Sequence, residues 1–188
     1  NYNYKLDYKI NPEKRTLIGD QIGINVGLIG DLKLSKNLNL RFEPGLYTNK
    51  SEIVFYNREK FTKNSDTLRS IKSTYIHFPL LIKYSAKRYN NIKPYVLGGL
   101  STSFNLSGNQ NSPEDNNNGV FRLKTNTFYY ELGFGIDFYL RYFKFSPSIR
   151  GVFSLKNEIV PDLDPNSPWT GNIDKMSTRA IFINFSFH

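Results

Sequence analysis

Few residues in this sequence have the type and spacing that catalysis or metal binding requires. The chain contains two histidines, His77 and His188, and no cysteine, so neither a disulfide framework nor a thiolate metal site can form. His77 is the residue that a serine–histidine or metal site would have to use. Nothing that flanks it supplies a nucleophile and an orienting group in a recognisable arrangement. We therefore expect His77 to be a hydrogen-bonded interior histidine, and we predict no catalytic residue.

A second candidate lies in an acidic segment nearer the carboxyl end. Asp162, Asp164 and Asn166 have the first spacings of a calcium-binding loop. Such a loop needs glycine at its sixth position and glutamate at its twelfth, where this chain has Ser167 and Ile173. We therefore predict an ordinary polar loop, with no bound metal and no cofactor.

A third set consists of charged residues that stand within apolar segments. Its members are Arg41, Glu43, Lys83, Glu131, Asp137 and Arg150. Buried charges have to be paired or hydrated, because an isolated buried charge is prohibitively costly. What these residues do therefore depends on the elements that position them.

Those elements are predicted to be β-strands, because apolar and polar residues alternate along most of the chain. From Phe128 to Leu140 every even-numbered residue is large and apolar, while Glu131, Asp137, two glycines and two tyrosines fall on the other face. Helical spacing does not produce this pattern. A strand of this length exceeds the usual ~5–6 residues of globular proteins, whereas a strand that crosses a bilayer needs ~9–11.

Seven further segments have the same alternation and bring the expected number of strands to eight. They are residues 2–10, 22–28, 38–46, 76–84, 93–107, 143–153 and 181–187. Short connectors at 35–37, 86–91 and 141–142 alternate with long polar connectors at 11–19, 57–70, 108–119 and 156–175. Bacterial outer-membrane barrels alternate tight periplasmic turns with longer outer loops in this way. The sequence predicts an all-β, eight-stranded antiparallel up-and-down transmembrane β-barrel over residues 1–188, with a first strand that is truncated at residue 1.

In such a barrel the six charged residues would project into the lumen. The side chains of an eight-stranded barrel fill its interior. We expect a structural plug of ion pairs, Arg41 with Glu43 and Glu131 with Arg150, and a conducting pore is the alternative. Three prolines interrupt the expected strands, and we predict bulges or rim positions there because proline cannot donate to a sheet ladder. They are Pro44, Pro79 and Pro147.

Alternation alone does not say which face of the sheet points inward, so a soluble up-and-down barrel such as a lipocalin is the rival interpretation. Two features favour the membrane barrel. The polar face is built of small residues and mixed charges, whereas a soluble exterior is more often rich in Lys and Glu. The last strand also ends in alternating aromatics, with Phe187 followed by His188, which is similar to the terminal signal read by the barrel-insertion machinery.

The formal net charge of +9 indicates phosphate-bearing partners. No basic helix or aromatic–basic platform suits nucleic acid, so we expect outer-membrane lipid, including lipopolysaccharide, or a protein partner. The basic residues expected in loops and turns are Lys14, Arg15, Lys60, Lys63, Arg69, Lys87 and Arg88.

Several strand motifs resemble the small outer-membrane barrel family of Bacteroidetes. These motifs are Leu40-Arg41-Phe42-Glu43-Pro44-Gly45-Leu46, Phe78-Pro79-Leu80-Leu81 with Lys83-Tyr84, and Pro94-Tyr95 leading to Gly98-Gly99. The later segments resemble the PorT (SprT) branch, namely Gly133-Phe134-Gly135-Ile136-Asp137-Phe138, Phe143-Lys144-Phe145-Ser146-Pro147, and Ile173-Asp174-Lys175-Met176-Ser177 with Arg179.

This resemblance implies an outer-membrane barrel that the type IX protein secretion system requires, the system that exports surface enzymes, adhesins and gliding components. It carries over no catalytic residue. An eight-stranded barrel is too narrow to pass a folded protein, so we expect an accessory or assembly role in secretion and not a conduit for the cargo. The alternatives are a generic small barrel with a structural or adhesive role, and a soluble ligand carrier.

Overall fold

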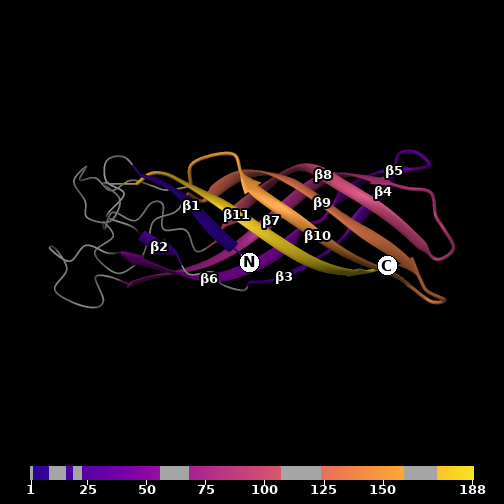
Figure 1. Cartoon of the computed structure of the whole chain (residues 1–188), viewed down its shortest axis with the longest axis horizontal. Coiled ribbons are helices and arrows are strands. Elements are labelled where there is room, and N and C mark those ends of the chain that lie inside the picture. The colour runs from indigo at the N-terminus through magenta and orange to yellow at the C-terminus, as the bar shows by residue number, and fades with distance from the viewer. Residues whose placement is uncertain (1, 9–15, 19–22, 56–67, 107–123, 159–172) are drawn as a thin grey trace.

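A computed structural model describes residues 2–8, 16–18, 23–55, 68–106, 124–158 and 173–188. Within these ranges the chain forms eleven β-strand elements that belong to one sheet (Figure 1). They are β1 (Tyr2–Tyr8), β2 (Thr16–Ile18), β3 (Ile24–Gly27), β4 (Gly30–Lys33), β5 (Leu38–Phe42), β6 (Gly45–Phe55), β7 (Leu68–Ser85), β8 (Ile92–Asn105), β9 (Asn126–Tyr139), β10 (Lys144–Ser154) and β11 (Ile173–Phe187). None of the described residues forms a helix long and apolar enough to cross a membrane.

The eleven elements combine into eight barrel strands. The long strand β7 pairs with β6 through its first half and with β5 through its second, so β5 and β6 lie end to end. On the other side of this composite strand, β2 and β3 pair with β6 while β4 pairs with β5. Every pairing is antiparallel, and from β7 onward each strand pairs with the next in the chain as far as β11, which also pairs with β1. The prediction of an eight-stranded antiparallel up-and-down barrel is confirmed.

The barrel encloses most of its polar and charged strand residues, together with two small apolar clusters, and carries large apolar side chains on its outside. Along β9 the residues alternate: Thr127, Tyr129 and Glu131 are buried, while Leu132 and Phe134 are each 60% exposed. The same alternation places large apolar side chains on the outside of β8 and β11. A water-soluble barrel needs the opposite arrangement, with apolar residues in the core. The soluble-carrier interpretation is therefore wrong, because its ligand pocket would have to be lined by the buried polar face.

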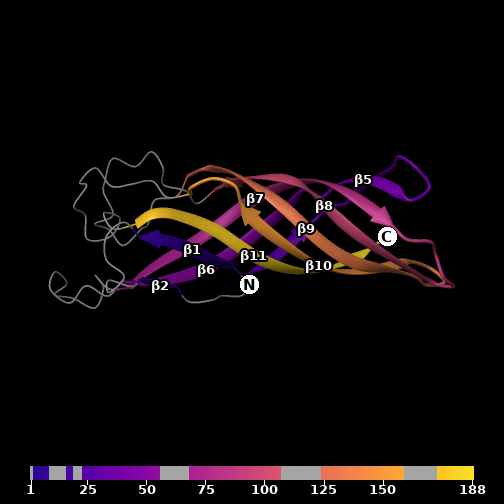
Figure 2. The same cartoon turned by 45° about the horizontal axis from the view of Figure 1, so that its top comes forward.

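The short connectors gather at one end of the barrel, opposite the end at which β7 and β11 begin (Figures 1 and 2). Backbone hydrogen bonds tie neighbouring short turns to the adjoining strands: Ser85 N donates to Asn37 O at 2.8 Å, and Tyr139 N donates to Asn91 O at 2.8 Å. The β7–β8 turn contains Asn90 with a φ of 51°. This left-handed conformation suits asparagine better than most residues.

Three strands extend into segments that the sequence predicted to be loops. Strand β7 begins at Leu68, inside the predicted loop 57–70, and β11 begins at Ile173, inside the predicted loop 156–175. The short strand β2 falls within the predicted loop 11–19. These predictions were wrong at their boundaries because cross-strand pairing recruits polar residues, as where β6 pairs with β7 from Val54↔Leu68 onward.

The prolines occupy irregularities, as predicted. Pro44 lies in the break between β5 and β6, and Pro79 lies opposite that break. The carbonyl of Pro79 accepts a hydrogen bond from Glu43 N at 3.2 Å, so the nitrogen of Pro79 points to the same side, where the ladder is already interrupted. Pro147 pairs with Phe185 of β11, and the β9–β10 register lapses beside it.

Several predicted positions lie outside the described residues. They are the calcium-loop candidates Asp162, Asp164 and Asn166 and the basic residues Lys14, Arg15, Lys60 and Lys63. Arg69 belongs to β7, not to a loop.

Candidate functional site

The first charged cluster of the lumen joins β7, β9 and β10. Lys83 Nζ donates to both carboxylate oxygens of Asp137, at 2.7 and 3.0 Å, and both side chains are buried. Ser146 Oγ donates to Asp137 Oδ1 at 2.7 Å. The same ammonium lies 3.8 Å from the centre of the Tyr95 ring, a cation–π distance. Lys83 of β7 and Asp137 of β9 thus neutralise each other's charge inside the barrel.

The second cluster is centred on Glu131, whose side chain is fully buried. Glu131 Oε1 lies 2.7 Å from His77 Nε2, and its Oε2 lies 3.2 Å from Arg150 Nη1. Arg150 Nη1 is also 2.9 Å from Glu43 Oε2. The guanidinium therefore lies between two carboxylates that come from β9 and from the break between β5 and β6.

The second cluster continues toward the short-turn end through Arg41. Arg41 Nη1 donates to Glu43 Oε1 at 3.2 Å, and its Nη2 donates to Asp31 Oδ2 at 3.0 Å. Asn39 Nδ2 donates to the other oxygen of Asp31 at 2.5 Å. Asp31 has no sequence signal of its own, because β4 is only four residues long and shows no extended alternation.

The structure thus places all six predicted lumen residues in two neighbouring clusters. Arg41, Glu43, Glu131 and Arg150 belong to one, and Lys83 and Asp137 belong to the other. The ring of Tyr95 links the two clusters, because its centre lies 5.6 Å from Arg41 Cζ of one cluster and 3.8 Å from Lys83 Nζ of the other. Each charge has an opposite charge within 3.2 Å, which is what burial of ionised groups requires.

His77 has hydrogen-bond partners on both ring nitrogens. Nδ1 lies 2.5 Å from Ser103 Oγ, and Nε2 lies 2.7 Å from Glu131 Oε1. A neutral imidazole satisfies both contacts if Ser103 donates to Nδ1 and the Nε2–H donates to Glu131. A hydroxyl, an imidazole and a carboxylate in this order have the connectivity of a serine-hydrolase triad.

This constellation is enclosed by other side chains. Ser103 and His77 are buried, and the rings of Tyr47 and Tyr129 lie edge-on to the imidazole, with centroids at 4.9 and 5.8 Å. The prediction of a hydrogen-bonded interior histidine is confirmed. The residues that flank His77 in the sequence supply neither partner, as expected; Ser103 comes from β8 and Glu131 from β9, which the sequence alone did not indicate.

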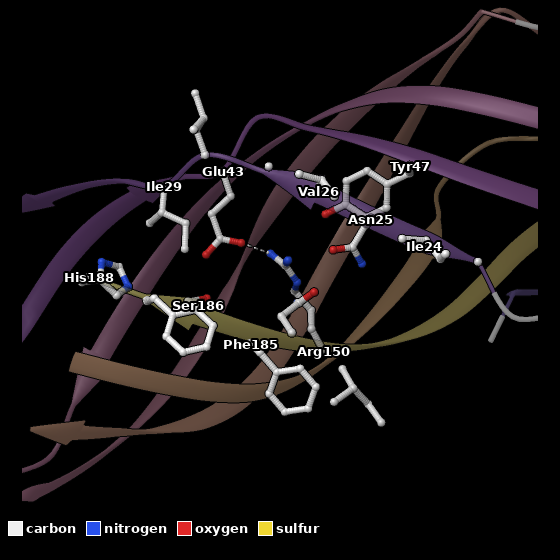
Figure 3. A pocket seen from close by; sticks show the side chains of 16 residues that line it. Ile24, Asn25, Val26, Ile29, Glu43, Tyr47, Arg150, Phe185, Ser186 and His188 are labelled. Carbon is white, nitrogen blue, oxygen red and sulfur yellow. Dashed lines mark ion pairs between the residues drawn. The ribbon is translucent and has the colours of Figure 1, made fainter. Parts of the chain in front are cut away.

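A pocket of about 750 Å³ opens beside the second cluster (Figure 3). One wall is the segment from Gly23 to Ile29, and the other is the end of β11 from Ile183 to His188. The Arg150–Glu43 ion pair lies at its base. The pocket shows that the sheet curls until β3 and β11 face each other. Strand β1 pairs with β11 only as far as Ala180, so among the described residues the seam beyond Ala180 is open.

Beyond the strands, Glu158 is buried in the connector that follows β10. Thr178 donates to it through its hydroxyl at 2.6 Å and its backbone nitrogen at 3.1 Å. Burial raises the pKa of this carboxyl above its ordinary value, against the weaker lowering effect of these hydrogen bonds.

Among the described residues, no three acidic, histidine or cysteine side chains are grouped so that they could hold a metal ion.

A curled sheet of antiparallel strands with buried charges inside and large apolar side chains outside is typical of an integral β-barrel of the bacterial outer membrane. Residues 1–160 match the family model described as an outer membrane protein beta-barrel domain, and the chain belongs to that family. The protein is therefore located in the outer membrane. Neither a curated protein nor a solved structure matches the chain.

Proposed function

We propose that this protein is a non-enzymatic accessory or assembly component of the type IX protein secretion system. The motifs in its strands that resemble the PorT (SprT) branch support this role. The single structural observation that favours an accessory over a conduit is the filled lumen, in which Arg41, Lys83, Glu131 and Asp137 are buried and paired. A barrel filled by its own side chains acts through its surface.

The filled lumen also argues for a structural role of the two charged clusters. Strands β4, β5, β7, β9 and β10 all contribute a charge to them. Opposite charges from distant strands stabilise one register and one curvature of the sheet. Such a stiff barrel would present its short turns to partners in a fixed arrangement.

The experiment is deletion of the gene in its native bacterium, followed by measurement of the secreted type IX cargo in the medium and on the cell surface. Loss of cargo, restored by a plasmid-borne copy, is the expected result. The abundance of an unrelated outer-membrane barrel is the control, because it must stay unchanged. Normal secretion in the deletion strain would remove the proposal and leave a generic structural or adhesive barrel.

A further inference from the structure

The short-turn end of the barrel carries a concentration of basic residues that lie beside the two lumen clusters. Seven basic residues stand there, and we call them the basic collar: Lys33, Lys36, Lys87, Arg88, Lys93, Arg141 and Lys144. The sequence contains no Asp or Glu between residues 32 and 38, 85 and 93, or 140 and 144. Within the described part of the chain, no collar residue forms an ion pair.

The collar is a ring and not a one-sided patch. Its residues come from the β4–β5, β7–β8 and β9–β10 connections, which follow one another around the barrel at the same end (Figure 2). Hydrogen bonds link the successive members of the ring, from Asn37 O to Ser85 N, from Asn91 O to Tyr139 N, and between Lys144 and His188 in both directions. The positive charge therefore lies at one level along the barrel axis.

Aromatic side chains lie at the same level. Tyr89 and Tyr142 are 78% and 88% exposed, and the rings of Phe143 and Phe187 lie 6.1 Å apart. Exposed tyrosines and phenylalanines at a barrel rim mark the boundary between the hydrocarbon and the headgroups. Arg88 lies 4.1 Å from the centre of the Tyr139 ring, which holds one collar charge at this boundary.

We propose that the basic collar binds the headgroups of anionic phospholipids in the periplasmic leaflet of the outer membrane. Short turns of such barrels face the periplasm, so the collar lies in the phospholipid leaflet. A level ring of cations beside an aromatic belt fits a plane of headgroup phosphates, whereas a protein partner would need a patch on one side. The proposal depends on the membrane placement of the barrel and not on the secretion role.

The test uses the folded barrel in nanodiscs that contain equal amounts of phosphatidylglycerol and phosphatidylcholine. Native mass spectrometry measures which lipids stay bound to the protein after it is released from the nanodisc. Each basic residue near an anionic surface contributes roughly a fivefold effect, so we expect the wild-type protein to retain phosphatidylglycerol at least about tenfold over phosphatidylcholine at low salt. The preference should weaken as salt is raised, since exposed charges are screened.

The collar variant replaces three residues with glutamine, Lys36→Gln, Lys87→Gln and Arg141→Gln. We expect its lipid preference to fall to within about twofold. The matched control removes the same charge from the opposite end, Lys124→Gln, Lys156→Gln and Arg179→Gln, and should keep the preference. Both variants must show the heat-modifiable mobility of a folded barrel.

Three outcomes would overturn the proposal. They are equal retention of both lipids by the wild type, an unchanged preference in the collar variant, and an equal loss of preference in the control variant. A crosslinker placed at Tyr89 that captures an acidic periplasmic protein, together with equal retention of both lipids, would assign the collar to that protein.

Discussion

The pair Lys83–Asp137 offers the sharpest test of how the lumen is stabilised. At 2.7 Å and an effective dielectric constant of ~20, the attraction between the two charges is about 6 kcal/mol, which the cost of removing both from water largely offsets. Intact, the pair therefore adds little net stability. Removal of one partner is different, because the other charge stays buried without compensation.

We predict that Lys83→Met and Asp137→Leu each lower the free energy of unfolding by about 3–5 kcal/mol. Lys83→Met leaves Asp137 with the hydrogen bond from Ser146 but without the ammonium that it binds directly, and Asp137→Leu leaves the ammonium over the Tyr95 ring without its carboxylate partner. The double variant, which fills the same space with apolar atoms, should lie within about 2 kcal/mol of the wild type. The coupling energy between the two sites would then be several kcal/mol.

The assay is urea unfolding of the barrel in lipid vesicles, followed by the gel shift between the compact and boiled forms. Lys124→Met, an exposed residue at the opposite end, is the control and should change the stability by less than about 0.5 kcal/mol. Single variants that cost less than about 1 kcal/mol would refute the reasoning, since they would mean that water reaches the pair. Additive single effects would refute the pairing itself.

Three further predictions concern other parts of the barrel. Because burial raises the pKa of Glu158 above 4.5, its ionisation in the folded protein costs stability as the pH rises through that raised pKa. Glu158→Gln should therefore be more stable than the wild type at pH 7.5 and lose this advantage below about pH 4.5, as urea midpoints at the two pH values will show. Gly99→Ala should destabilise the barrel by about 1–3 kcal/mol, because the added methyl would overlap a carbonyl oxygen of β7, whereas Gly30→Ala, with its nearest atom at 3.6 Å, should be nearly neutral in the same assay. A fluorophosphonate probe should not label Ser103 in the folded barrel, since its hydroxyl is buried and bonded to His77, and labelling detected by mass spectrometry would contradict the enclosed site.

The strands and their faces could be predicted from the sequence because the period of two is a local property. In β9 every second residue from Phe128 faces outward, as the alternation indicated. The ends of the strands could not be predicted in the same way. Leu68 and Ile173 begin strands whose first residues are mostly polar. The extended conformation of these residues depends on partners in β6 and β1, and β1 lies far away in the chain.

The composition of the charged clusters was harder to predict than the inward direction of their residues. His77 contacts Ser103 and Glu131, which are 26 and 54 residues away in the sequence. These contacts follow from the register of β7 with β8 and from the width of the barrel, neither of which has a local signal. Asp31 was missed for a related reason, since only its pairing opposite Arg41 identifies it as an inward-facing acid.

The inside-out polarity of the barrel also explains why a triad-like arrangement can exist here without an obvious reaction to perform. The outward face of the sheet meets lipid and has to be apolar, so the hydroxyls, imidazoles and carboxylates of the strands lie on the inward face. Ser103, His77 and Glu131 satisfy one another, and two tyrosine rings cover the imidazole. A nucleophile that is to attack a lipid ester has to reach the outer surface, and Ser103 points to the opposite side of the sheet. The arrangement therefore joins β7 to β8 and β9 through side chains of the inward face.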